Sequence, residues 1–432
     1  MTPGAKSLVS RVAVFALGAA IWIWPVPEGL TAPAWRLFAI FAATIASVIV
    51  GAFPILTASV LAVAVAVLSG ILPPAKAYAG FANGTILLIV VAFLVARAIV
   101  KCGLGQRLGY LVVALFGKST LGLGYSVFLM DAVVAPAFPS DTARSGVLYP
   151  LALSLAEGGG SKPDEATRKR MGAYLMFCAM ATLSLSSALW LTAMAGNPLG
   201  AEIGKTAGFS VSFGSWLLAS SVPTLVALLF LPFLIYKVFP PEVKSTPEAP
   251  AAARKALAAM GPLSADEKIV AVTFVAMVVL WALAGTLKVD LTAVAFLGLG
   301  TLLATGALTL KDIGQQGDVL ATFIWFAILF AISGQLNALG FMGYLGQRLG
   351  GALGGLPWPA AYAILVLAYV VLHYLFVSQT AHVLALFGVF LGVGAQLGVP
   401  VPLLGFALLF STSYFSTITP QSSSANLLVV GS

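Results

Sequence analysis

The sequence predicts an all-α polytopic membrane protein with an inverted internal repeat and two re-entrant hairpins. Three observations predict this fold: a very apolar composition, recurring apolar runs of membrane-spanning length, and two short motifs that each occur twice in the same order. Of the 432 residues, 60% are apolar and 8% are charged, whereas a soluble domain carries about 25% charged residues. The composition therefore excludes a soluble protein.

Ten apolar runs predict membrane-spanning helices, since a span needs about 20 apolar residues. Two further apolar stretches, 121–155 and 358–398, carry polar residues at their centres and predict hairpins. We expect residues 1–33 to form an uncleaved N-terminal helix, because no small-x-small cleavage site follows its apolar run. The ten predicted spans are 12–25, 35–51, 54–73, 84–101, 171–195, 214–237, 268–286, 290–309, 319–339 and 403–418.

A polar segment divides the chain into two halves of similar plan. Residues 34–238 form repeat 1, 239–267 form a cytoplasmic linker, and 268–432 form repeat 2. The pattern Ser264-Ala265-Asp266-Glu267 predicts a capping box that opens the next helix. We expect repeat 2 to lack the closing span that repeat 1 has at 214–237.

The basic residues indicate the orientation of the chain. With a cytoplasmic N-terminus and hairpins that return to their own side, 16 of the 22 Lys and Arg residues lie inside, 5 lie outside, and Arg144 lies at a hairpin tip. The first hairpin then enters from the cytoplasm and the second from outside. The net charge of +8 therefore reports topology and predicts no nucleic-acid partner. We expect the inner membrane of a bacterial-type cell.

Two motifs reveal an internal repeat. Leu104–Gly109 (LGQRLG) recurs as Leu345–Gly350, and Ser140-Asp141-Thr142-Ala143-Arg144 is echoed by Ser378-Gln379-Thr380-Ala381-His382. Because the two copies have opposite orientations, they predict an inverted-topology repeat, which is typical of secondary transporters. Each Ser-x-Thr-Ala motif lies at the centre of one hairpin.

Each half also contains a polar interruption within a span. The first, 192–198, includes Thr192 and Asn197, and the second, 417–426, includes Thr419, Pro420 and Ser422. Unwound backbone at membrane depth is tolerated only within protein or beside a water-filled cavity. The two interruptions and the two hairpin tips therefore predict one shared site.

The tips have the chemistry of a receptor for carboxylates. Helix N-termini carry a partial positive charge, Thr142 and Thr380 add hydroxyl donors, and Ser140 and Ser378 can bind an anion or a cation. Two such tips suit an anion with a carboxylate at each end. The simpler alternative is that these hydroxyls only cap helices.

The ionisable residues of the hairpins leave alternatives open. Asp141 either pairs with Arg144 at i+3 or binds a coupling cation or a proton, and Asp131 is a weaker candidate. His373 and His382 would lie on opposite faces of a continuous helix, so we expect no shared metal. His382 either binds a substrate carboxylate or changes its protonation with pH.

The segments Pro139–Arg144 and Ser378–His382 resemble the paired Ser-Asn-Thr signatures of the divalent-anion/sodium symporter family. Within that family the chain is most similar to the 2-oxoglutarate/malate translocator group, through residues 103–107, 116–126, 191–199 and 240–250. The resemblance implies a homodimer with a static scaffold and an elevator-type transport domain that carries both hairpins.

The resemblance also implies site residues, carried over by position. Asp141 and Gln379 stand where the family has asparagine, which leaves sodium coupling, proton coupling and anion exchange open. We expect no cofactor and no structural metal, with Na⁺ as the coupling ion that the resemblance implies. The implied substrate ligands are Ser140, Asp141, Thr142, Asn197, Ser378, Gln379, Thr380, Thr419, Pro420 and Ser422, and the implied coupling-ion ligands are Ser140, Asp141, Thr192, Ser378 and Gln379.

The predicted function is secondary active transport of C4–C5 dicarboxylates such as malate, succinate or 2-oxoglutarate, by cation symport or anion exchange. Citrate or another divalent anion such as sulfate is the alternative substrate, and a truncated, non-transporting member is the alternative role. An enzyme is disfavoured because the polar residues are divided symmetrically between the halves.

Overall fold

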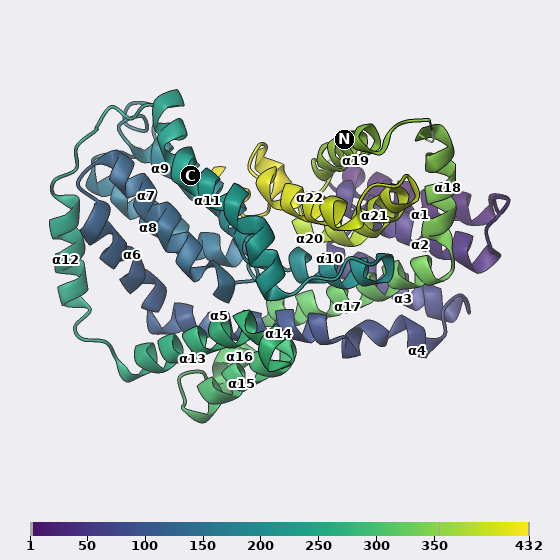
Figure 1. The fold of residues 1–432 in the computed structure, drawn as a ribbon, viewed down its shortest axis with the longest axis horizontal. Coiled ribbons are helices and arrows are strands. Elements are labelled where there is room, and N and C mark those ends of the chain that lie inside the picture. The colour runs from purple at the N-terminus through teal and green to yellow at the C-terminus, as the bar shows by residue number, and fades with distance from the viewer. Residues whose placement is uncertain (1–2, 354, 431–432) are drawn as a thin grey trace. The chain divides into compact units, whose positions relative to one another are not determined.

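The computed structural model describes residues 3–353 and 355–430. Within them the regular secondary structure is helical, apart from one isolated antiparallel bridge between Ser119 and Ser245. The chain forms two compact units, each assembled from segments of both predicted repeats (Figure 1). Unit 1 comprises Met1–Val90, Pro198–Ser210 and Gly317–Thr412, and unit 2 comprises Val91–Asn197, Val211–Gln316 and Ser413–Ser432.

Unit 1 contains the opening helices of the chain and the second hairpin. Helix α5 (Gly84–Cys102) begins in this unit and ends in unit 2, whereas α10 (Gly196–Gly204) and α22 (Val401–Tyr414) lie largely in unit 1. Its other elements are α1 (Pro3–Ile23), α2 (Ala32–Ile49), α3 (Ile55–Leu68), α4 (Pro74–Ala77), η1 (Ala79–Ala82), η3 (Lys205–Ala207), α17 (Gly317–Ala338), α18 (Phe341–Leu353), α19 (Trp358–His373), α20 (Gln379–His382), the π-helical η4 (Val383–Phe387) and α21 (Gly388–Gln396).

Unit 2 contains the first hairpin and both broken segments. In it α7, α8 and α9 pack side by side, and α11 packs on α9 and α7 (Figure 1). Its elements are α6 (Leu104–Phe116), α7 (Thr120–Val134), η2 (Ala135–Ala137), α8 (Asp141–Gly158), α9 (Gly172–Leu189), α11 (Phe213–Val238), α12 (Ala249–Ala259), α13 (Ala265–Ala282), α14 (Ala284–Leu287), α15 (Leu291–Ala304), α16 (Leu310–Gly314), η5 (Pro420–Ser422) and α23 (Asn426–Val430).

The predicted all-helical membrane fold is confirmed. Within the described residues, 7 helices are long and apolar enough to cross a bilayer, and shorter apolar helices accompany them. Each of the ten predicted spans falls on a helix. Five predicted ends lie four or more residues past the helix end, those of α3, α9, α13, α15 and α22. At α9, which stops at Leu189 rather than 195, and at α22, which stops at Tyr414 rather than 418, the backbone unwinds although the sequence stays largely apolar.

The linker was predicted only as a polar connection, and this was incomplete. It contains α12, which packs against α6. Ala253 of α12 is buried in a core cluster with Val113 and Met171. The hydropathy pattern missed this helix because α12 is built from alanine, which forms helices well but adds little to a search for apolar spans.

The LGQRLG repeat lies in one helix of each half. The first copy opens α6, whereas the second begins at Leu345, four residues after the start of α18 at Phe341. The residue before each helix is a glycine with positive φ, Gly103 at 80° and Gly340 at 84°. Left-handed backbone of this kind favours glycine. The glycine before each helix is therefore a repeat of local backbone geometry, although the two motif copies stand at different positions within their helices.

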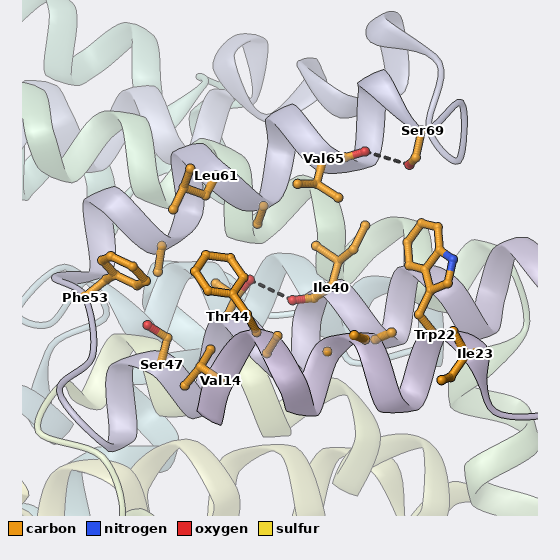
Figure 2. Close-up of a pocket in the computed structure, with 17 residues that line it drawn as sticks. Val14, Trp22, Ile23, Ile40, Thr44, Ser47, Phe53, Leu61, Val65 and Ser69 are labelled. Atoms are coloured by element: carbon orange, nitrogen blue, oxygen red, sulfur yellow. Dashed lines mark hydrogen bonds between the residues drawn. The ribbon is translucent and has the colours of Figure 1, made fainter. Parts of the chain in front are cut away.

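Unit 1 holds an apolar cavity of about 420 Å³ between α1, α2 and α3 (Figure 2). The hydroxyls of Thr44 and Ser69 donate back to helix carbonyls, those of Ile40 at 2.7 Å and Val65 at 2.6 Å. These two hydroxyls are therefore engaged by their own helices, and the remaining lining is largely apolar. This cavity does not have the chemistry of an anion site.

A buried ion pair joins the first repeat motif to the start of repeat 2. Arg107 Nε donates to Glu267 Oε1 at 2.6 Å and Nη2 donates to Oε2 at 3.1 Å. Glu267 also accepts from the Ser264 N–H at 2.8 Å, so the predicted capping box is confirmed. The equivalent Arg348 lies instead over the ring of Tyr344, 5.4 Å from its centroid.

We predict that Arg107→Gln lowers the stability of the protein by about 3–5 kcal/mol, because it leaves a buried carboxylate without its cation. Thermal unfolding of the purified protein in detergent measures the effect. Arg107→Gln combined with Glu267→Gln should recover much of the loss, and Arg348→Gln is the matched control with little effect. Equal losses for Arg107→Gln and Arg348→Gln would contradict the role of the pair.

Candidate functional site

The first hairpin turns at the predicted residues. Helix α7 gives way to η2, which contains Pro136, and α8 begins at Asp141 after Pro139. Proline removes a backbone donor and interrupts a helix. Ser140 is the N-cap residue of α8, and its hydroxyl accepts the Ala143 N–H at 3.2 Å.

The second hairpin has the same cap in unit 1. Ser378 is the N-cap residue of α20, and its hydroxyl accepts the Ala381 N–H at 3.2 Å. Both serine hydroxyls are therefore engaged in capping, as the simpler alternative held. Within the same hairpin, Gln379 Nε2 donates to the Thr412 carbonyl at 3.2 Å, and Thr380 is largely buried.

Two asparagines close the broken helices. Asn197 Nδ2 donates to the carbonyl oxygens of Ser187 at 2.8 Å and Trp190 at 3.2 Å. Asn426 Nδ2 donates to the carbonyls of Ser416 at 2.7 Å and Thr419 at 3.1 Å. In both copies the acceptors lie ten and seven residues before the asparagine. Each amide therefore satisfies carbonyls left over where a helix ends.

The first tip is bonded to the first broken segment. The Ala195 N–H donates to the Pro139 carbonyl at 3.0 Å, and Thr192 Oγ1 donates to the Pro136 carbonyl at 2.8 Å. These bonds satisfy irregular backbone on both sides. Thr192 is therefore a structural link between the hairpin and the break.

The first tip also meets the second broken segment. Thr142 Oγ1 lies 2.7 Å from Ser424 Oγ, and both residues are exposed. Ser184 of α9 bonds Ser416 at 2.6 Å, and the Ser422 hydroxyl is engaged with the carbonyls of Ser416 and Thr419, each at 2.6 Å. Unit 2 thus gathers one hairpin tip and both breaks around hydroxyl groups.

The predicted site residues accordingly fall into two groups. That both groups form one shared site stays a prediction. The first group lies in unit 2 and comprises Ser140, Asp141, Thr142, Thr192, Asn197, Thr419, Pro420 and Ser422, whereas Ser378, Gln379 and Thr380 lie in unit 1.

The two histidines lie together, contrary to the expectation from their spacing. The ring centroids of His373 and His382 are 4.9 Å apart because the chain reverses between them, so the geometry of a continuous helix does not apply. His382 Nε2 is 3.2 Å from the Tyr369 carbonyl, and its ring packs on Tyr369 at 4.1 Å. Among the described residues, no three His, Cys, Asp or Glu side chains form a group that could hold a metal.

The predicted pair at the first tip is present. Arg144 Nη2 lies 2.6 Å from Asp141 Oδ1, and Ser187 Oγ donates to the same oxygen at 2.5 Å. Asp131, the weaker candidate from the sequence, is the third ionisable member, with its Oδ1 3.7 Å from Arg144 Nη1. All three charged side chains are buried.

Two polar residues of this centre were missed, Ser186 and Ser187, which bind the charged cluster. Ser424, which bonds Thr142, and Asn426, which closes the second break, lie within the predicted interruption 417–426 but were not singled out as ligands. The available signal was the serine run within the apolar span of α9, at 184, 186 and 187. Hydroxyls repeated inside a membrane helix indicate polar partners within the protein.

We predict that Asn197→Ala and Asn426→Ala each lower stability by about 1–3 kcal/mol, because each leaves buried carbonyls without a donor. Melting temperatures of the purified variants test this. Asn337→Ala is the control, since Asn337 is exposed and its amide donates to the Thr206 hydroxyl at 3.3 Å. Losses no larger than that of the control would show that the caps are dispensable.

The chain matches known transport proteins along nearly all of its length. The family model described as the sodium:sulfate symporter transmembrane region matches residues 5–432. Dicarboxylate transporter 1, chloroplastic, of Spinacia oleracea is 39% identical over 417 residues, which cover 96% of this chain and 73% of the relative. Putative malate transporter YflS of Bacillus subtilis (strain 168) is 39% identical over 423 residues, covering 98% and 88%.

A solved structure shares the fold. The YdaH transporter of Alcanivorax borkumensis, described as having an unusual topology, aligns with a TM-score of 0.51 over 82% of this chain and 78% of its own. Its sequence identity is 16%, so the likeness concerns the fold alone.

Proposed function

Because this chain belongs to the sodium:sulfate symporter family, we propose that it is a secondary active transporter of C4–C5 dicarboxylates. It is a multi-pass integral membrane protein, and its relatives are transporters rather than enzymes. The substrates in this proposal are malate, succinate and 2-oxoglutarate. Transport proceeds by cation symport or by anion exchange.

The observation that carries the proposal is the polar centre of unit 2, where one hairpin tip is bonded to both broken segments. Thr142 and Ser424 present exposed hydroxyls there, beside the N-terminus of α8. A helix N-terminus and hydroxyl donors are suited to a carboxylate. In a transporter with inverted repeats, broken helices of this kind form the substrate site.

The substrate class follows from the chemistry of the tips and the names of the relatives. Two relatives are named for dicarboxylates and malate, and the helix N-terminus and hydroxyls of the first tip suit a carboxylate of such an anion. Sulfate, named by the family model, offers a single tetrahedral centre. In this proposal Ser140, Asp141, Thr192, Ser378 and Gln379 are the residues through which sodium would act.

The proposal extends to the assembly. A homodimer with a static scaffold and a moving transport domain follows from the family resemblance. The outer surface of α11 is consistent with lipid or subunit contact, since Leu218, Val222 and Leu229 are exposed. Mass photometry of the purified protein tests the dimer.

We predict that proteoliposomes take up labelled 2-oxoglutarate, and that internal malate stimulates uptake. Repeating the assay with and without sodium separates cation symport from exchange, and excess sulfate tests the alternative substrate. Absence of dicarboxylate-dependent uptake under every condition would overturn the proposal. Competition by sulfate but not by malate would assign the alternative substrate.

We predict that Thr142→Val lowers the uptake rate at limiting substrate at least tenfold, because a hydrogen bond to a charged group contributes about 1.5–3 kcal/mol. Thr301→Val is the matched control, since the Thr301 hydroxyl donates to the Leu297 carbonyl of its own helix. Equal uptake by the two variants would remove Thr142 from the site.

A further inference from the structure

Three charged side chains meet in the interior of unit 2. Asp131 comes from α7, whereas Asp141 and Arg144 come from α8, and each is no more than 5% exposed. Arg144 Nη2 lies 2.6 Å from Asp141 Oδ1, and Nη1 lies 3.7 Å from Asp131 Oδ1. The guanidinium of Arg144 is therefore the shared cationic partner of two carboxyl groups.

The hydrogen bonds divide the two carboxyl groups into different roles. Asp141 Oδ1 receives the direct bond of Arg144 and the Ser187 hydroxyl at 2.5 Å. Asp131 Oδ2 accepts from the hydroxyls of Ser186 and Thr182, but Asp131 Oδ1 is buried without a hydrogen-bond partner. Asp141 thus has a direct bond to the guanidinium, whereas Asp131 has only the longer contact of 3.7 Å with it and one oxygen without a hydrogen-bond partner.

Two ionised carboxylates would leave the cluster with a net charge of −1. A buried charge without a paired counterion is very costly, and two nearby acids that share one cation cannot both ionise readily. A metal ion next to Asp131 Oδ1 would face the guanidinium of Arg144. A proton is the cation that fits.

Among the described residues of unit 2, Arg144 is the charged partner of Asp131. Its neighbours on α9 are the hydroxyls of Thr182 and Ser186. The other elements packed on α7 are α6, α11 and η2. In the described structure their titratable and charged side chains are engaged elsewhere: Arg107 binds Glu267, Tyr110 accepts from Gln106, Lys237 lies over the Phe233 ring, and Tyr236 packs on Tyr174.

We propose that Asp131 is a proton-binding site and is held as a neutral carboxylic acid beside an ionised Arg144–Asp141 pair. The cluster then carries no net charge. As a consequence, which rests on the proposed function, a dicarboxylate can approach the first tip without repulsion from a second buried carboxylate. The proton thus sets the charge beside the anion site, although the buried Asp131 side chain itself does not contact the substrate.

Infrared spectroscopy of the purified full-length protein at neutral pH tests the proton directly. The wild type should show the carbonyl band of a protonated carboxylic acid, and Asp131→Asn should lose it. Glu157→Gln, which removes an exposed acid from α8, should keep the band. A wild type without the band, or a band that survives Asp131→Asn, overturns the proposal.

Thermal unfolding gives a second test. The melting temperatures of Asp131→Asn and Asp141→Asn should differ if Asp131 is neutral, and should fall alike if it is ionised. Asp131→Asn replaces a neutral acid by a neutral isostere, so its melting temperature should stay near that of the wild type. Asp141→Asn removes the ionised partner of Arg144 and should lower it. Equal losses in the two variants would mean that Asp131 is ionised. Because neither readout uses a substrate, failure of transport and failure of the proton assignment are distinguishable.

Discussion

The structure depends on satisfying backbone polar groups where membrane helices break. Lipid offers no hydrogen bonds, so a broken helix survives only where protein groups or enclosed water replace them. Here two buried asparagines do this with the same geometry: Asn197 and Asn426 each donate to carbonyls ten and seven residues earlier. Without these bonds the helix ends would be uncompensated.

The breaks in turn position the first hairpin. The tip carbonyls of Pro136 and Pro139 accept from Thr192 and Ala195 of the first break, and Thr142 meets Ser424 of the second. The contacts with the first break use the carbonyls of the tip, whereas the exposed Thr142 hydroxyl is engaged by Ser424 of the second break. The polar centre of unit 2 is thus assembled from the groups left over by helix interruption.

Much of the fold could be predicted because a bilayer imposes length and hydropathy on every span. The ten spans, the LGQRLG repeat and the capping box at Ser264 all depend on local sequence and correspond to observed elements. Local sequence could not reveal α12, whose alanines carry helix propensity but little hydropathy. It also misplaced the ends of α9 and α22, because unwinding there is decided by tertiary partners such as Asn197 and Asn426.

The site was predictable only in part for the same reason. The Asp141–Arg144 pair is visible in sequence because i and i+3 are neighbours on a helix. Asp131 reaches Arg144 only through packing between α7 and α8, and His373 reaches His382 only because the chain reverses between them. The net charge at the first tip therefore cannot be deduced from Asp141 and Arg144 alone. A neutral pair near a carboxylate site tolerates a dianion, whereas the same pair with an ionised Asp131 repels one. Whether this tip binds dicarboxylates thus depends on a residue ten positions away in sequence that has no motif of its own.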